Sequence, residues 1–285
     1  METSDPDDFM TLLLLLGHPR VDLRAVTVTP GTLEQVGLVC WALRALGRDV
    51  RVGARNLDHG KPCVSAWHYA AYGDIAASRD AEPASALLLE VLDADTTLVT
   101  GAALKNLGDA LRRVDGEGLA FRLGRLVIQG GFAGEGVVPP ALQLEKFRGR
   151  VTCPTFNLNG DPKSALLALA HPAIAQRRLV AKNVCHGVVY DAALHARVGE
   201  ARERSRSLAL IWAGMDHYLR HRPGGKIFHD PLAACCAIDP SIATWAEVEV
   251  FRERGEWGSR LSPGTGTSII IDLDRERFVQ TLVAT

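Results

Sequence analysis

The sequence predicts an α/β protein with a mostly parallel, Rossmann-like sheet flanked by helices. Short apolar strands alternate with helical stretches of about 10 to 15 residues, which is typical of βαβ units. The chain has 285 residues, of which 47% are hydrophobic, so it can bury the core of one large domain. We therefore expect a single domain over residues 1–285.

The elements follow this alternation in order. A helix is expected over about 6–17, strands at 21–29, 49–54, 97–102 and 125–131, and helices at 33–47 and 104–114. After a stretch rich in Pro and Gly, we expect a helix at 161–170, a strand at 177–184, a charged helix over about 201–220 and a final apolar segment at 268–283. Ligands of parallel sheets lie at the carboxyl ends of the strands. The site is therefore expected near residues 29–32, 100–106, 129–131 and His229.

Charge and composition limit the kinds of molecule that this protein is expected to bind. Lys and Arg number 32 against 33 Asp and Glu, and no long basic run is present, which excludes an electrostatic footprint for nucleic acid. The six cysteines show no CxxC spacing, so reduced thiols in a cytoplasmic protein are expected. The apolar run at 9–16 is too short to span a bilayer. We expect a small-molecule substrate and no membrane partner, and a homo-oligomer is compatible with the sequence.

The opening stretch METSDPDD carries four acidic residues. A helix start accounts for three of them, with Asp5 as N-cap, Pro6 in the first turn, and Asp7 and Asp8 near the positive end of the helix dipole. It leaves Glu2 unexplained. A divalent cation would also explain Glu2, because Ca²⁺ binds several carboxylate oxygens and removes their mutual repulsion.

A second candidate is the stretch FHDPLAA at 228–234. Asp230 is expected to cap a helix, with Pro231 in its first turn. The alternative is catalytic: a His beside a metal-bound acid can act as a general acid, since its ordinary pKa is about 6.5. Local sequence leaves both interpretations open.

These motifs together resemble the inosine-uridine nucleoside hydrolase family over nearly the whole chain. The acidic opening is similar to that family's Asp-rich N-terminal motif, and FHDPLAA matches its late His-Asp-Pro motif. Four further stretches follow the family's order, namely VDLRAVTVTPGT, VTGAALKNLGDAL, RLVIQGG and PTFNLNGDPKSA. The resemblance implies the nucleoside hydrolase fold, one bound Ca²⁺ and hydrolysis of an N-ribosidic bond.

The resemblance also implies roles for single residues. Asp8, Asp230 and the backbone carbonyl of Thr100 or Gly101 would bind Ca²⁺. Asp7 and His229 would be the catalytic residues: Asp7 would bind the ribose diol and His229 would lie near the departing base. Asn157 would face the sugar. Thr32 and Gln129 are further candidates for substrate contact.

The sequence departs from the family pattern at several positions. Thr3 stands where the family's second Asp would fall, which leaves Glu2 or Asp5 as the replacement ligand or base. Thr32, Val137 and Thr155 replace family residues expected near the sugar. We expect a calcium-dependent nucleoside hydrolase with an altered substrate. The alternatives are a catalytically weak homologue that binds a ribosyl ligand and, from another class, a metal-dependent phosphohydrolase.

The acids follow Met1 almost directly. In a parallel α/β fold, carboxylates at a strand end are normally delivered by a preceding strand of about 5 to 6 residues. We expect such a strand to belong ahead of Met1, and without it we expect weak calcium binding.

Overall fold

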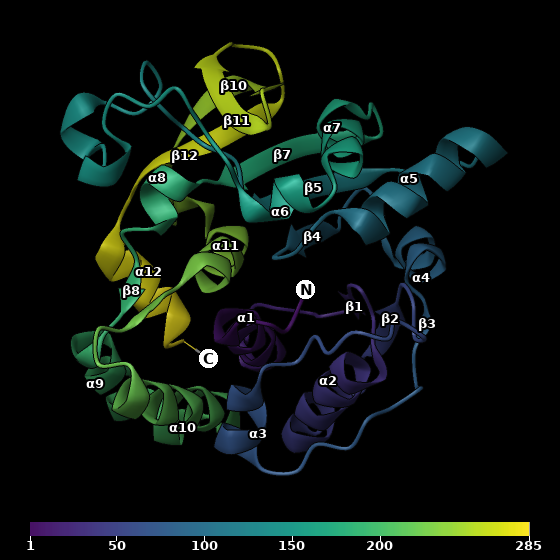
Figure 1. Ribbon diagram of the computed structural model, residues 1–285, viewed down its shortest axis with the longest axis vertical. Coiled ribbons are helices and arrows are strands. Elements are labelled where there is room, and N and C mark those ends of the chain that lie inside the picture. The colour runs from purple at the N-terminus through teal and green to yellow at the C-terminus, as the bar shows by residue number, and fades with distance from the viewer. Residues whose placement is uncertain (285) are drawn as a thin grey trace.

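The computed structural model describes residues 1–284 and has a mixed α/β architecture with helices packed around a central sheet (Figure 1). The helices are α1 (Pro6–Gly17), α2 (Leu33–Leu46), α3 (Ala66–Tyr72), α4 (Ala84–Val91), α5 (Lys105–Glu117), α6 (Phe156–Gly160), α7 (Pro162–Ala170), α8 (Lys182–Cys185), α9 (Ala192–Ala201), α10 (Arg206–His221), α11 (His229–Ile238) and α12 (Arg275–Leu282). The strands are β1 (Ala25–Val28), β2 (Arg51–Ala54), β3 (Glu82–Pro83), β4 (Thr97–Thr100), β5 (Leu123–Gln129), β6 (Thr152–Cys153), β7 (Ile174–Val180), β8 (Val189–Tyr190), β9 (Lys226–Ile227), β10 (Ala243–Glu253), β11 (Glu256–Leu261) and β12 (Thr267–Leu273).

The main sheet has seven strands in the order β4-β5-β7-β12-β10-β11-β6. Its first four strands run parallel, with Val99 of β4 opposite Val127 of β5. Strands β10, β11 and β6 pair antiparallel at the other edge. The expected mostly parallel sheet with flanking helices is thus present, and the antiparallel extension is an addition that the sequence pattern did not indicate.

A second, smaller sheet contains β1, β2 and β3, all parallel. A cavity of about 440 Å³ lies between β1 and β4, and its walls include residues 23–27 and 96–99. Met1 lies at this cavity and pairs with the end of β1: its ammonium donates to Thr27 O at 2.8 Å, and Thr29 N donates to its carbonyl at 3.1 Å. Asp8, Gly101 and Asp230 also border this cavity.

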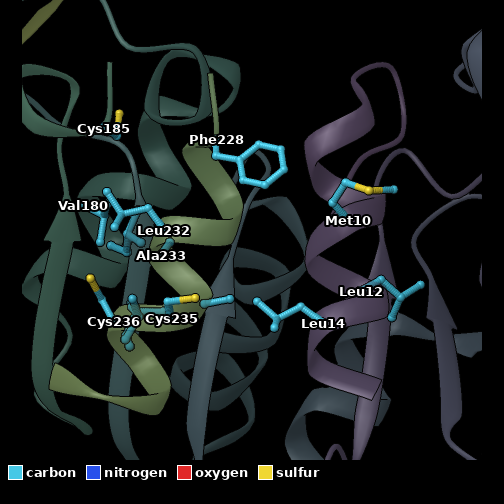
Figure 2. Close-up of a cluster of buried hydrophobic side chains, with 14 of the residues drawn as sticks. Met10, Leu12, Leu14, Val180, Cys185, Phe228, Leu232, Ala233, Cys235 and Cys236 are labelled. Carbon is cyan, nitrogen blue, oxygen red and sulfur yellow. The ribbon is translucent and has the colours of Figure 1, made fainter. Parts of the chain in front are cut away.

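Helices α1 and α11 form the centre of the core. Figure 2 shows Phe228 and Leu14 in the space between the two helices, while Val180, Leu232 and Ala233 gather on the sheet side of α11. All of these side chains are fully buried. Because apolar packing surrounds both helices, their first turns are held in fixed positions, and these turns carry Asp7, Asp8 and Asp230.

Several expected boundaries need correction. Helix α1 begins at Pro6 as expected, but Asp5 makes no capping hydrogen bond. Helix α11 begins two residues earlier than expected, with Phe228 at the cap position and Asp230 inside the first turn. The charged helix expected over 201–220 is α10, which starts at Arg206 because the Ser205 side chain accepts a hydrogen bond from Leu208 N.

Within the described residues, no helix has both the length and the apolar character needed to cross a bilayer.

Candidate active site

A cavity of about 310 Å³ lies at the carboxyl ends of the parallel strands. Gly101 follows β4, Gln129 ends β5, and Lys182 lies just after β7, and all three line the cavity. The N-terminal segment and the start of α11 complete the walls. The position agrees with the general placement of ligand sites in open parallel sheets.

Three carboxylates, which we call the acidic cluster, meet at this cavity: Asp7, Asp8 and Asp230. They are only 2%, 3% and 5% exposed. One oxygen from each lies within 4.8 Å of the others, so the three could share one metal ion. The resemblance placed these residues together, and the structure brings them together although Asp230 is more than 220 positions away in sequence.

The acidic cluster is electrostatically strained without a counter-ion. Burial raises the pKa of Asp8 and of Asp230 well above the usual range, and like charges nearby, first Asp230 for Asp8 and Asp7 for Asp230, raise them further. Asp230 Oδ1 is buried and has no hydrogen-bond partner within residues 1–284. A hard cation such as Ca²⁺ binds this kind of oxygen set, so the residues present fit the ion.

Gly101 is fitted closely against the acidic cluster. A Cβ at this position would lie 2.7 Å from Asp230 Oδ1, a distance that excludes any side chain. Gly101 lines the cavity, whereas Thr100 is absent from its walls. The choice between the backbone carbonyls of Thr100 and Gly101 as a metal ligand stays a prediction.

Asp7 already has hydrogen-bond and ion-pair partners within the protein. Its Oδ2 accepts hydrogen bonds from His229 N at 3.1 Å and from Asp230 N at 3.4 Å, so it caps α11 in place of Asp230. Its Oδ1 lies 3.2 Å from the ammonium of Lys226. Asp7 thus fixes the start of α11 and with it the positions of His229 and Asp230.

Lys226 is a site residue that the sequence analysis missed. Its side chain is 8% exposed, and its ammonium lies between Asp5 Oδ1, at 3.1 Å, and Asp7 Oδ1. Burial opposes the charge of Lys226, but the two carboxylates outweigh it and raise its pKa. The signal available in the sequence was a lysine three residues ahead of His229, in the short strand β9.

Glu2 and Asp5, the two residues open for the role of the missing Asp, both line the cavity. Asp5 is held by Lys226. Glu2 accepts a hydrogen bond from Ser4 Oγ at 3.4 Å, and within residues 1–284 it makes no ion pair within 4.0 Å. Glu2 is therefore the carboxylate that is free to meet a ligand.

His229 lines the cavity in a chain of polar contacts. Its Nδ1 lies 3.3 Å from Cys185 Sγ, and Gln129 Nε2 donates to that sulfur at 3.7 Å. Burial raises the pKa of Cys185 to about 12, so the thiol keeps its proton. We infer that the thiol donates to Nδ1, which leaves the ring proton of His229 on Nε2.

The charge state of His229 differs from the expectation. Burial, followed by the nearby Lys226, lowers the pKa of His229 to about 4, so the ring is neutral at pH 7. A neutral imidazole still donates one hydrogen bond, from Nε2 in this arrangement. His229 can therefore assist a leaving group as a hydrogen-bond donor, without starting as an imidazolium.

Asn157 and Gln129 also line the cavity. Asn157 Nδ2 donates to the backbone oxygen of Gln129 at 3.0 Å and to its side-chain oxygen at 2.7 Å. Thr32 lies elsewhere: it is the N-cap of α2 in a capping box with Gln35, and it does not line the cavity. The position of Thr32 therefore gives it a structural role.

Comparison with known proteins gives the family. The sequence profile of inosine-uridine preferring nucleoside hydrolases matches residues 4–280. The chain belongs to this family. An uncharacterized protein of Aquifex aeolicus is 27% identical to it over 288 residues, which cover 98% of this chain and 94% of the relative. Members of the family are N-glycosyl hydrolases, so the protein is an enzyme of this class.

Two solved structures of the family share the fold. The purine-preferring ribonucleoside hydrolase of Gardnerella vaginalis has a TM-score of 0.71 at 17% identity, with 100% of this chain and 95% of that chain covered. The inosine-uridine preferring nucleoside hydrolase of Bacillus anthracis has a TM-score of 0.71 at 16% identity, with 99% and 96% covered. The nucleoside hydrolase fold expected from the sequence is confirmed.

Proposed function

We propose that the protein hydrolyses the N-ribosidic bond of a nucleoside-like substrate with the help of Ca²⁺ held by Asp8 and Asp230. The observation that supports this most strongly is the acidic cluster, where buried carboxylates converge and Asp230 Oδ1 has no partner. In the reaction, water adds to the sugar carbon, the C–N bond breaks, and free base and ribose are released.

The acidic cluster, Gly101 and Glu2 form the ion-binding wall in this proposal. When bound, Ca²⁺ supplies positive charge that orients the ribose diol and the attacking water. Asp7 pairs with Lys226 and holds the start of α11. These negative groups also stabilise the positive charge that develops on the sugar in an oxocarbenium-like transition state.

Proton movement is assigned to two residues. Glu2 lines the cavity and is free of Lys226, so we propose that its carboxylate takes the proton of the attacking water. His229 Nε2 donates to the departing base, and Cys185 sets that tautomer from the other side of the ring. Gln129 and Asn157 form the wall that faces the sugar.

The test is the release of free base by the purified protein. Inosine and uridine are incubated with calcium and, in parallel, with excess chelator, and free base is measured by chromatography. The proposal expects calcium-dependent release. Binding of ribose without release of base from any nucleoside would instead favour the ribosyl-binding alternative. Release that is unaffected by chelator would remove the ion from the proposal.

A further inference from the structure

Two lysines and a histidine lie at or beside the same cavity, and the proposed hydrolysis does not use them. We call Lys146, Lys182 and His186 the cationic wall, after its two ammonium groups. Lys182 and His186 line the cavity, and the ammonium of Lys146 lies 2.7 Å from His186 Nδ1. Lys182 begins α8, His186 follows its last residue, and Lys146 lies in a short 3-10 helix (Glu145–Phe147) ahead of β6.

The cationic wall has no built-in counter-charge. Within residues 1–284, no carboxylate oxygen lies within 4.0 Å of the ammonium of Lys146 or Lys182. The polar partners of Lys182 are uncharged: it donates to Pro154 O at 2.7 Å and approaches Cys153 Sγ at 3.9 Å. Lys226, by contrast, lies between two carboxylates.

The positive charge also acts on the neighbouring ring. Burial, followed by His229, Lys146, Lys182 and Lys226 in that order, lowers the pKa of His186 to about 3. Excess positive charge in a concave, partly dry site attracts anions more strongly than it would in water. The wall is therefore suited to a negatively charged group of a ligand.

Thr155 gives a second, independent observation. It follows Pro154, the residue that Lys182 contacts, and it lines the same cavity. Its side chain is only 2% exposed, and its hydroxyl has no hydrogen-bond partner within the described part of the chain. A buried hydroxyl without a partner is costly unless a ligand supplies one.

We propose that the substrate carries an anionic oxygen group, a phosphate or a carboxylate, which binds to the ammonium of Lys182 and the hydroxyl of Thr155. This inference rests on the proposed function, because it places the ribose of the same substrate at the acidic cluster. Charge-assisted hydrogen bonds to the ammonium supply most of the attraction, and the hydroxyl adds direction. The anion is either a 5'-phosphate of the ribose or an acid group on the base.

The experiment compares uridine, uridine 5'-monophosphate and orotidine as substrates in the presence of calcium. Uridine is neutral, the second compound carries the anion on the ribose, and the third carries it on the base. We expect kcat/KM for one of the two anions to exceed that for uridine at least tenfold. The compound with the higher kcat/KM shows whether the anion lies on the ribose or on the base.

Variants of Lys182 and Thr155 test whether the cationic wall causes the preference for an anionic substrate. In Lys182→Met, the ratio of kcat/KM for the preferred anion to that for uridine is expected to fall tenfold or more. Lys182→Arg is expected to restore part of the ratio, and Thr155→Val, which keeps the side-chain shape, to lower it several-fold. Lys163→Met is the matched control, since this exposed lysine of α7 lies outside the cavity. A parent enzyme that prefers uridine, or a ratio unchanged in Lys182→Met, overturns the proposal.

The anion site is tested apart from hydrolysis, by calorimetry with two pairs of probes: ribose 5-phosphate against ribose, and orotate against uracil. If neither inosine nor any of the three compounds is hydrolysed, the proposed function fails but the wall can still be tested. Tenfold tighter binding of the anion in one of the two pairs, lost in Lys182→Met, supports the anion site. Equal affinity within both pairs, or a preference that survives in Lys182→Met, contradicts it.

Discussion

The acidic cluster and the cationic wall border one cavity, but they differ in how far their charges are balanced by other groups of the protein. At the acidic cluster, Asp7 has two backbone donors and Lys226 as partners, whereas Asp230 Oδ1 has no partner within the described residues. At the cationic wall, Lys182 has only uncharged partners. One region thus compensates part of its charge internally, and the other compensates none of it.

This difference indicates what each region needs from a ligand. Burial, followed by neighbouring like charges, raises the pKa of Asp8 and of Asp230, so a cation would complete that region. Lys182 needs an anion. A substrate with a diol at one end and an acid group at the other would satisfy both regions.

The largest expected effect comes from Asp8→Asn. It removes one carboxylate of the acidic cluster while keeping the side-chain volume, so both calcium-dependent thermal stabilisation and activity should be lost. Charge stabilisation by a metal is worth several kcal/mol, so we expect kcat to fall on the order of 10³-fold or more. Asp49→Asn, an exposed site, is the control. A melting temperature that ignores both calcium and chelator in the parent protein would contradict the role of Asp8.

His229→Ala tests the donor to the departing base. General acid or hydrogen-bond assistance is typically worth about 10² to 10⁴ in rate, so kcat should fall within that range. Affinity for ribose should change little, because His229 is assigned to the base. His221→Ala, an exposed position at the end of α10, is the matched control. An unchanged kcat would limit His229 to a structural contact with Cys185.

Lys226→Met tests the internal compensation at the acidic cluster. Breaking a buried ion pair leaves an uncompensated charge, which typically costs about 3 to 5 kcal/mol. In chelator, the melting temperature should therefore drop by roughly 6 to 10 °C. In calcium the drop should be smaller, because the ion would balance the same carboxylates. An equal drop in both conditions would show that Lys226 and the ion do not share this role.

Cys185→Ala should have the smallest effect of these variants. Without the thiol, His229 Nδ1 loses a hydrogen bond that favours one tautomer. One such bond is worth about 1 kcal/mol, so kcat should fall about fivefold at unchanged KM. Cys185→Ser keeps a donor and should recover most of the loss. Equal rates for the Ala and Ser variants would show that Cys185 does not set the tautomer.

The sequence predicted the parts of the fold that depend on the local apolar pattern and on residues that start or end an element, such as proline. Helix α1 follows from Pro6 and the apolar run after it, and β4 and β5 follow from compact apolar stretches. The hairpin of β10 and β11 was missed because its exposed residues interrupt the apolar pattern.

The site was predictable only in part. Asp7, Asp8, His229 and Asp230 were found because acids and His-Asp pairs stand out in sequence. The contact of Lys226 with Asp7 was not, because it joins a two-residue strand to α1 across more than 200 positions. Lys182 lies two residues after the end of β7. The sequence analysis extended that strand to residue 184, so it did not recognise Lys182 as a residue at the carboxyl end of a strand, where ligands bind.

Calcium titration by calorimetry is the most direct test of the acidic cluster as a metal site. We expect one calcium ion bound per chain in the parent protein and no measurable binding in Asp230→Asn, with circular dichroism showing that the variant is folded. Asp49→Asn should bind calcium like the parent. No calcium binding by the parent, or the same affinity in Asp230→Asn, would contradict a metal site at the acidic cluster.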